Sequence, residues 1–253
     1  MTDPSNPQTA LEQLLEQLGD CVETSFAQRE DHSYDGLKIS CLPDAVIRVK
    51  EDSQVGIVLK IANEHRIAVT TRGAGSSLTG GATPIQGGWV LDLSGLNQLE
   101  IDKRNQVAHC GPGVVVADLQ AEAAKDGLFY PPDPSSKKFC TIGGNIACNA
   151  GGLRCVKYGV TRDYVLALEG FLANGEKVRW GRATRKFATG YNLRDLWVGS
   201  EGTLGVVTQA TLRLIDLPKH AATFLGVFES DEVALSDRKS TRLNSSHLVI
   251  SYA

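Results

Sequence analysis

The chain has 253 residues and a formal net charge of -3, with 42% hydrophobic and 22% charged residues. This composition is ordinary for a globular protein of one large domain or two modest ones, and it excludes the basic footprint of a nucleic-acid-binding protein. No apolar run approaches the roughly 18 residues that span a bilayer, and the polar N-terminus lacks the features of a signal peptide. We expect a cytoplasmic protein and leave open a peripheral attachment to the inner membrane through partner subunits.

The first 44 residues predict an N-terminal helical arm, with an amphipathic helix over residues 9–18 that ends at Gly19. A new unit begins after Pro43 with a strand over residues 45–49. The pattern then predicts a helix capped by Ser53 and continuing to residue 66, and strands over residues 67–71 and 89–93. The second of these three strands leads directly into a glycine-rich loop.

The middle of the chain predicts antiparallel hairpins interrupted by a few helices. The first hairpin joins residues 99–102 to 106–110, and a second joins 164–172 to 176–180 through the turn Asn174-Gly175. A helix is expected from residue 113 to about residue 125, whereas three prolines make residues 129–138 irregular. Residues 205–214 alternate as a closing strand. The fold class predicted is α+β, with no regular βαβ repeat.

The C-terminal part of the chain contains two segments of different character. Residues 224–228 predict one further strand. Residues 237–253 are basic and serine-rich, and they match the translation of a sequencing-library adapter. We therefore expect this tail to be foreign to the protein and the natural chain to continue beyond Ser236, so the tail is excluded from reasoning about the fold.

Six cysteines are present, at positions 21, 41, 110, 140, 148 and 155. None forms a Cys-x-x-Cys pair, and no histidine lies at zinc-finger spacing from them. An iron–sulfur cluster would require closely spaced thiolates, which this spacing does not provide. We expect buried, reduced thiols and no metal site.

Three glycine-rich stretches indicate a nucleotide site: residues 72–81, 141–152 and 199–205. Glycine lets backbone approach a ligand closely, and the N–H groups of such a turn form an anion-binding nest. The first stretch lacks the third glycine of the dinucleotide fingerprint at Leu78, and no Gly-Lys-Ser/Thr sequence marks an NTPase loop. In the other two stretches, Asn145 and Asn149 could bond a ring edge or serve only as turn residues. Glu201 could accept from ribose hydroxyls or cap a turn.

Taken in order, the sequences Val69–Gly81, Tyr130–Ser136, Thr141–Asn145, Asn149–Gly152, Lys157–Gly159 and Gly199–Val206 closely resemble the FAD-binding domain of the vanillyl-alcohol oxidase / p-cresol methylhydroxylase flavoprotein family. The resemblance covers roughly residues 30–236. It is strongest to the branch of D-lactate dehydrogenases and glycolate oxidases. The resemblance implies an FAD-binding domain over residues 45–218, with two α+β subdomains near 45–98 and 99–217. Residues 219–236 would begin a C-terminal cap domain that is otherwise missing.

The resemblance also implies a set of FAD-binding residues. The first loop would hold the pyrophosphate, the segments at 133–135 and 141–145 would follow the flavin and its ribityl chain, and residues 201–207 would lie near the adenosine half. The full set is Arg72, Gly73, Ala74, Gly75, Ser76, Ser77, Leu78, Asp133, Pro134, Ser135, Thr141, Gly143, Gly144, Asn145, Asn149, Gly152, Glu201, Gly202, Val206 and Val207.

The same resemblance implies how the cofactor is attached and which reaction is catalysed. Some relatives tether the flavin to a histidine in the first loop, where this chain has Ser76, so non-covalent FAD is expected; His109 is the nearest alternative. The implied reaction oxidises a D-2-hydroxy acid, D-lactate or glycolate, to the 2-oxo acid. The catalytic and metal-binding groups would lie in the cap domain, so no catalytic residue is assigned; His220 is too isolated for the role. Tyr191 and Asn192 either face the flavin or begin a helix.

Two other functions and several electron acceptors stay open. The chain could be a non-catalytic flavin-binding subunit of a larger dehydrogenase complex, or a relative that oxidises aryl alcohols or acts on an alkyl-lipid intermediate. The acceptor could be a quinone, a cytochrome, an electron-transfer flavoprotein or oxygen.

Overall fold

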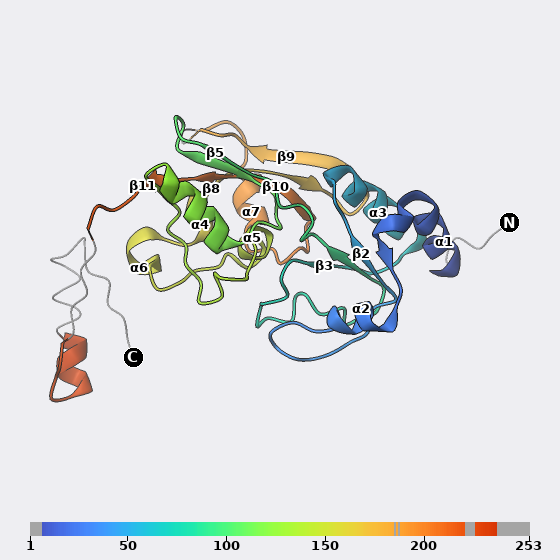
Figure 1. The fold of residues 1–253 in the computed structure, drawn as a ribbon, viewed down its shortest axis with the longest axis horizontal. Helices are drawn as coiled ribbons and strands as arrows, with labels where there is room; N and C mark the ends of the chain where they lie inside the picture. Colours follow the sequence, from blue (N-terminus) through green and yellow to red (C-terminus); the bar gives the residue numbers. More distant parts are fainter. Residues whose placement is uncertain (1–6, 185, 187, 221–225, 237–253) are drawn as a thin grey trace.

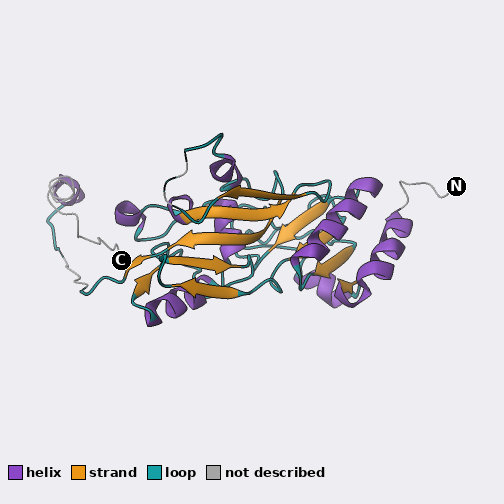
Figure 2. Ribbon diagram, turned by 90° about the horizontal axis from the view of Figure 1, so that it is seen from above, coloured by secondary structure: helices purple, strands orange, loops and turns teal. Residues whose placement is uncertain are grey.

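The structure, a computed structural model, describes residues 7–184, 186, 188–220 and 226–236. The expected adapter-like tail, residues 237–253, lies outside the described residues. The described chain forms two lobes side by side along the long axis of the molecule, with the N-terminal helices at one end (Figures 1 and 2). Both lobes combine helices with a sheet, so the predicted α+β class is confirmed.

The first lobe is a four-stranded sheet with strand order β1-β2-β4-β3. Strands β2, β4 and β3 are parallel, and β1 adds to the edge in the antiparallel direction. Its elements in chain order are α1 (Pro7–Leu18), the 3-10 turn η1 (Gly19–Cys21), β1 (Val22–Glu23), α2 (Phe26–Asp31), β2 (Ala45–Arg48), α3 (Asp52–His65), β3 (Val69–Arg72) and β4 (Trp89–Asp92).

Helix α3 crosses between the parallel strands β2 and β3, as a βαβ connection requires. It begins earlier than the predicted cap: Glu51 is the N-cap residue, and its backbone N–H donates to Gln54 Oε1 at 3.1 Å. The prediction that Ser53 caps this helix is therefore wrong. The helix ends at His65, and the C-cap residue Arg66 takes a left-handed conformation with φ 56°.

The predicted N-terminal arm packs into this lobe. Ala10, Leu14 and Leu18 on one face of α1 are buried in the same core as Val55 and Val58 of α3. The amphipathic helix predicted from the periodicity therefore buries its apolar face against α3.

The second lobe is a five-stranded antiparallel sheet with strand order β5-β6-β10-β8-β9, accompanied by a two-stranded sheet of β7 and β11. Both predicted hairpins are present: β5 pairs with β6, and β8 pairs with β9. Its elements are β5 (Leu99–Asp102), β6 (Val107–Cys110), α4 (Val116–Lys125), β7 (Leu128–Phe129), α5 (Ile142–Cys148), α6 (Cys155–Tyr158), η2 (Thr161–Tyr164), β8 (Val165–Phe171), β9 (Lys177–Gly181), α7 (Leu193–Trp197), β10 (Val206–Arg213) and β11 (Ile215–Asp216).

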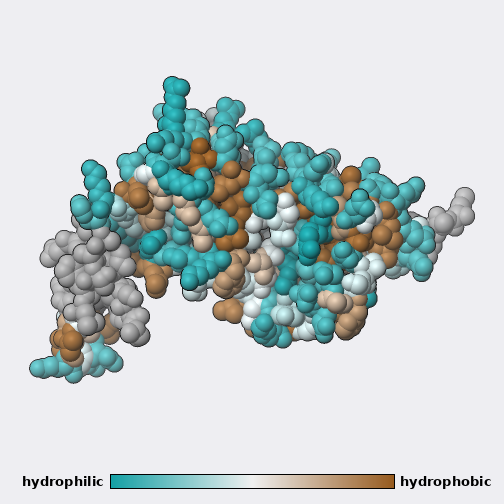
Figure 3. Space-filling view, viewed as in Figure 1, coloured by the Kyte–Doolittle hydropathy of each residue, from teal (hydrophilic) through white to brown (hydrophobic). Residues whose placement is uncertain are grey.

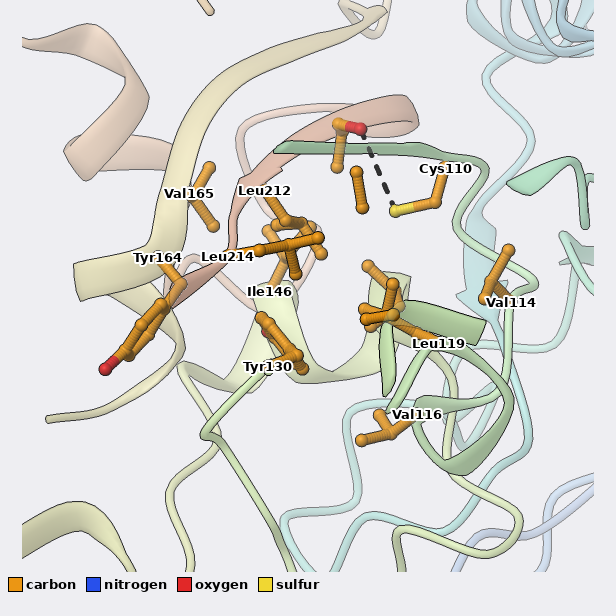
Figure 4. Packing of buried hydrophobic residues seen from close by; sticks show 14 of the residues in the cluster. Cys110, Val114, Val116, Leu119, Tyr130, Ile146, Tyr164, Val165, Leu212 and Leu214 are labelled. Atoms are coloured by element: carbon orange, nitrogen blue, oxygen red, sulfur yellow. Dashed lines mark hydrogen bonds between the residues drawn. The ribbon is translucent and has the colours of Figure 1, made fainter. Parts of the chain in front are cut away.

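The core of the second lobe lies between this sheet and helices α4 and α5. Leu212 near the end of β10 and Leu214 just after this strand meet Leu119, Ile146 and the fully buried Tyr130 (Figure 4). The Cys110 thiol donates to the carbonyl of Ala210 on the neighbouring strand at 3.7 Å, and burial raises its pKa to about 12. This cysteine is therefore a buried, unreactive thiol, as expected.

The two lobes meet along a tight joint between α3 and the hairpin of β8 and β9. A Cβ atom on Gly56 would lie 2.7 Å from the ring of Phe171, and one on Gly175 would lie 2.7 Å from the carbonyl of Gly56. Phe171 and Val206, from strands of the second sheet, are buried in the core of the first lobe. Only glycines allow backbones this close, so the relative position of the lobes is fixed by packing.

The prediction of a strand over residues 224–228 is wrong where the structure describes it. Residues 226–228 have no regular secondary structure, and residues 231–236 are helical. A strand requires a hydrogen-bonded neighbour, and in the described part of the chain no strand pairs with this segment. Hydrophobic pattern alone could not reveal that missing partner.

Candidate functional site

A cavity opens where the two lobes meet, and all three glycine-rich stretches line it. About 1090 Å³ of space lies between the stretches, counting the open solvent at the mouth of the cavity. On the face seen in Figure 1, hydrophobic and neutral surface gathers near the centre, where the lobes meet (Figure 3). The three stretches lie far apart in the sequence, and the fold brings them around one space.

Most of the predicted binding residues line this cavity. They are Arg72, Gly73, Ala74, Gly75, Ser76, Ser77, Pro134, Thr141, Gly143, Gly144, Asn145, Glu201, Gly202, Val206 and Val207.

Five predicted residues do not line the cavity: Leu78, Asp133, Ser135, Asn149 and Gly152. The Leu78 side chain is 75% exposed. The Asp133 carboxylate accepts from the backbone N–H of Arg154 at 3.1 Å and pairs with its guanidinium at 3.3 Å. Asn149 ends α5 in a left-handed conformation, where its Oδ1 accepts from the backbone N–H of Arg162. These contacts give Asp133 and Asn149 structural roles near the site.

The first loop follows β3 and lies against the second lobe at close range. A Cβ atom on Gly73 would collide with the Thr141 hydroxyl, so any larger residue there would displace that hydroxyl. Gly75 has φ +61°, in the left-handed region that glycine populates readily. The first loop therefore needs glycine at Gly73 for contact with the next loop and at Gly75 for its own turn.

The side chain of Arg72 holds this loop in place through hydrogen bonds to neighbouring segments of the first lobe. Its guanidinium donates to the carbonyl oxygens of Tyr34 at 2.6 Å and of Asp31 and Ala82 at 3.4 Å. The same guanidinium lies so close to Gly75 that a Cβ there would collide with it. These hydrogen-bond donors are directed at protein carbonyls, so the guanidinium holds the loop that is predicted to bind the pyrophosphate.

A buried charged cluster supports Arg72 at the carboxyl ends of the parallel strands. Asp92 is 3% exposed and accepts from the Arg48 Nε at 2.8 Å, while His32 Nε2 lies 3.5 Å away. Burial disfavours the charge on Asp92, but hydrogen bonds from His32, Arg48 and Ser94 outweigh it and hold its pKa well below the usual range. Burial lowers the pKa of Arg72 from its ordinary value, an effect that the nearby Asp92 opposes.

The second stretch folds into the short helix α5, which the sequence did not predict. The backbone N–H of Gly143 donates to Pro112 at 2.8 Å, and a Cβ on Gly143 would lie 2.6 Å from the Pro112 side chain. Within the described residues, the Thr141 Oγ1 and the Asn145 Nδ2 are buried and have no hydrogen-bond partner. Both residues line the cavity. Buried polar atoms without partners are costly, so a ligand that bonded to them would satisfy them.

The third stretch is tied to α5 through the backbone. The N–H of Gly199 donates to Ile146, and the N–H of Glu201 donates to Ala147, both at 2.9 Å. Glu201 takes a left-handed φ of 51°, which is uncommon for a residue other than glycine. Its carboxylate reaches the first loop, where it accepts from the Thr79 hydroxyl at 3.0 Å.

Sequence reasoning missed several lining residues outside the predicted set, among them Leu93, Pro112, Cys140, Cys148 and Trp197. Pro112 and Leu93 line the cavity because loops from both lobes converge there. No local sequence pattern predicts that convergence. Trp197 is 5% exposed and packs against the backbone of Gly205. Cys140 and Cys148 lie beside or within the second glycine stretch, and that proximity was the one available signal.

The alternative site residues lie elsewhere. His109 is in β6, where its Nδ1 lies 3.1 Å from the Thr211 hydroxyl, and it does not line the cavity. Asn192 caps α7 by accepting from the backbone N–H of Asp195 at 3.3 Å, whereas Tyr191 is 92% exposed. His220 is exposed. No cluster of side chains within the described residues could hold a metal ion, and no described helix is long and apolar enough to cross a membrane.

Glycine loops from two lobes surround one cavity, between a small mixed sheet and a larger antiparallel one. This arrangement is typical of a domain that binds a large nucleotide. The comparisons agree with this class. Residues 43–181 match the family described as FAD binding domain, which is more than half of the chain. The protein therefore belongs to the FAD-binding domain family, and FAD is its cofactor.

Two curated relatives are similar over most of this chain. Glycolate oxidase subunit GlcD of Bacillus subtilis (strain 168) is 46% identical over 226 residues, covering 88% of this chain and 48% of the relative. D-lactate dehydrogenase of Anaerostipes hadrus is 43% identical over 206 residues, covering 80% of this chain and 43% of the relative. The chain thus spans about half the length of these relatives.

A solved structure shows the same fold. An alkyldihydroxyacetonephosphate synthase has a TM-score of 0.78 and 21% identity, with 96% of this chain and 50% of that chain covered. At this identity the likeness concerns the fold alone.

The residues present fit FAD. Glycines of all three stretches line the cavity, so backbone without side chains borders the space that a broad ligand would occupy. Its floor offers the unpartnered hydroxyl of Thr141 and amide of Asn145. Ser76 adds a hydroxyl donor from the first loop.

Proposed function

We propose that this chain supplies the FAD-binding part of a flavoenzyme that oxidises a D-2-hydroxy acid, with D-lactate or glycolate as substrate. The observation that carries the proposal is the pair of buried, unpartnered polar atoms on the cavity floor, Thr141 Oγ1 and Asn145 Nδ2, within three converging glycine stretches. The substrate class rests on relatives named glycolate oxidase subunit and D-lactate dehydrogenase.

Each stretch receives a part of the cofactor in this proposal. The first loop holds the diphosphate through backbone N–H groups and the hydroxyl of Ser76, and the hydrogen bonds of Arg72 to protein carbonyls hold the loop in place. Pro134, Thr141 and the glycines of α5 lie along the flavin and ribityl chain. Glu201 and the strand start at Val206 lie near the adenosine half. Asp133 supports this arrangement through Arg154.

FAD is held without a covalent bond in this proposal. The first loop presents Ser76 where some members of the vanillyl-alcohol oxidase family present a histidine. The thiols of Cys140 and Cys148 also line the cavity, and burial raises the pKa of each above its ordinary value. A raised pKa leaves less of the nucleophilic thiolate, which favours an untethered cofactor.

When bound, FAD supplies the acceptor for the hydride equivalents that leave the hydroxy acid. The described residues bind and orient it and exclude water from the cavity floor, where Leu93, Ile146 and Trp197 contribute apolar walls. The base for the hydroxyl proton and the cation for the substrate carboxylate are proposed to lie in the half of the relatives' length that this chain does not span.

The direct test is to purify the chain and record its visible spectrum, followed by titration of the FAD-free protein with FAD. We expect flavin absorbance with FAD released by heat denaturation, and saturable binding. A folded protein that is colourless and leaves FAD fluorescence unchanged on titration would contradict the proposal.

A second candidate function is a non-catalytic flavin-binding subunit that docks on a catalytic partner. This candidate is supported by the name of the Bacillus subtilis relative, which is a glycolate oxidase subunit. Sequencing the gene through codon 236 separates the two: a natural stop there supports the subunit, and a continuing reading frame supports the enzyme. A substrate panel on the full-length protein, with quinone, cytochrome and electron-transfer flavoprotein as acceptors, then tests the substrate and the electron acceptor.

A further inference from the structure

The polar groups at the floor and at the rim of the cavity differ in how they are bonded. On the floor, Thr141 and Asn145 are at most 5% exposed and keep a polar atom without a partner. At the rim, exposed polar side chains bond to one another across the opening. The floor groups are available to a ligand, whereas the rim groups already have partners.

The rim bonds join the two lobes. The Thr79 hydroxyl, on the first loop, donates to Glu201 Oε2 on the third loop at 3.0 Å. Ser77 Oγ lies 2.9 Å from the Thr79 hydroxyl and 3.7 Å from the Cys148 thiol of the second stretch. This short chain of contacts connects all three glycine stretches on the solvent side of the cavity.

Glu201 is held in place for this contact. It has a left-handed φ of 51°, and the following Gly202 has φ +78°. A Cβ on Gly81 would lie 3.0 Å from the Glu201 carboxylate, so the carboxylate lies close against the first loop at this glycine. Strained backbone of this kind persists where surrounding structure requires it and tends to occur at ligand clamps.

Because Glu201 is negatively charged, it is not expected to bind the phosphates directly. It is the one acidic side chain among the described residues that line the cavity. A carboxylate repels a diphosphate, so Glu201 gains nothing from direct contact with that group. Its hydrogen bond to Thr79 is exposed to solvent, and such a bond is weak enough to open and close.

We propose that Thr79 and Glu201 are a positioning pair whose hydrogen bond across the cavity rim governs how fast FAD enters and leaves. This inference rests on the proposed function, because it requires that FAD occupies the cavity. The bond must open to admit the cofactor and closes again once the cofactor is seated, so breaking it accelerates both steps. The floor contacts of Thr141 and Asn145, by contrast, set the affinity.

The test is stopped-flow FAD fluorescence on the FAD-free chain, with release measured by trapping free FAD. Thr79→Val removes the hydroxyl at constant shape, Glu201→Ala removes the acceptor, and Thr79→Ser restores the donor. We expect about five- to tenfold faster binding and release in the first two variants, wild-type rates in Thr79→Ser, and no further gain in the double variant Thr79→Val/Glu201→Ala. The matched control is Thr203→Val, whose hydroxyl bonds to Ser200 in its own loop.

The outcomes separate the two proposals. If wild-type protein binds FAD but Thr79→Val and Glu201→Ala keep wild-type rates, the positioning role is wrong and the FAD proposal stands. Slower binding in these variants would also overturn it, because removing a bond that closes the rim cannot slow entry. A wild-type chain that binds no FAD overturns the proposed function, and the inference with it. Because the Thr79–Glu201 bond is exposed, the melting temperature of the FAD-free variants should match that of wild type.

Discussion

The two lobes hold the walls of one cavity by different means. The first lobe fixes its glycine loop with buried side-chain charge, through Arg72 and the cluster around Asp92. The second lobe fixes its two stretches with backbone hydrogen bonds and glycine contacts, such as Gly143 against Pro112 and Glu201 to Ala147. The first wall should therefore be sensitive to loss of a charged side chain, and the second to gain of a methyl group.

The largest effect is expected from Arg72→Met. Removing the guanidinium takes the donor away from the carbonyl oxygens of Tyr34, Asp31 and Ala82. It also takes a cation away from the buried Asp92, which should lower the free energy of unfolding by about 3–5 kcal/mol. Urea denaturation of the FAD-free chain measures it. The matched control is Arg179→Met, an exposed partner of Glu169, for which we expect at most about 0.5 kcal/mol. If both variants lost the same free energy of unfolding, buried charge would not be what fixes the loop of the first lobe.

The charged cluster also predicts a pH dependence. Because the folded state holds the pKa of Asp92 below its unfolded value, its contribution to stability is complete above about pH 4 and is lost as pH falls further. We expect Asp92→Asn to be less stable than wild type at pH 7, with the gap narrowing towards pH 2. Urea midpoints at several pH values test this, and a gap independent of pH would show that the carboxylate charge is not what holds the first wall.

The second wall is tested by a pair of adjacent glycines in α5. Gly143→Ala would push a methyl group against Pro112 and should cost about 1–3 kcal/mol, whereas Gly144→Ala meets only the Thr141 hydroxyl at 3.6 Å. Alanine also favours a helix over glycine, so Gly144→Ala should be neutral or stabilising by up to about 1 kcal/mol. Thermal unfolding of both FAD-free variants decides whether contact at Gly143, and not helix propensity, dominates here.

Thr141→Val separates ligand binding from stability on the cavity floor. The hydroxyl is buried and has no partner among the described residues, so its loss should leave stability unchanged or raise it slightly. FAD affinity should fall about tenfold, and Thr141→Ser should retain it. Fluorescence titration measures this affinity. A variant that loses stability while keeping full affinity would show that the hydroxyl serves the fold.

The smallest effect is expected at the surface between the walls. Lys177 Nζ pairs with Asp52 of the first lobe at 2.7 Å and with Glu169 at 3.5 Å, but the lysine side chain is 49% exposed. Lys177→Met should therefore cost about 0.5 kcal/mol or less at low salt and nothing measurable at about 1 M salt. A larger, salt-independent loss would mean that charge also fixes the joint.

The sequence predicted the second lobe better than the supports of the first. Alternating apolar residues and the Asn174-Gly175 turn specify local hairpins, and both formed as predicted. The bracing of Arg72 depends on Tyr34 and Asp31, whose segment is mixed and polar and carries no periodic pattern. The glycines located the cavity because they are needed for close approach. The direction of the Arg72 side chain could not be predicted, since it depends on contacts with residues distant in the sequence.

Helix α5 is a second element that local sequence could not predict, because contacts distant in the sequence stabilise it. Two adjacent glycines argue against a helix, and the sequence indicated only an apolar, glycine-rich stretch there. The contact of Gly143 with Pro112 and the burial of Ile142 and Ile146 in the core outweigh that propensity. This helix gives Thr141 and Asn145 their buried positions on the floor.

The glycine joint at Gly56 and Gly175 has a consequence for how the molecule unfolds. Phe171 and Val206 belong to the second sheet yet complete the core of the first lobe, so neither lobe can lose its structure without exposing apolar surface of the other. The two lobes should therefore melt together in one cooperative, two-state transition, with equal calorimetric and van't Hoff enthalpies. The cavity between them would then exist only in the fully native state, and cofactor binding would report on the integrity of both lobes at once.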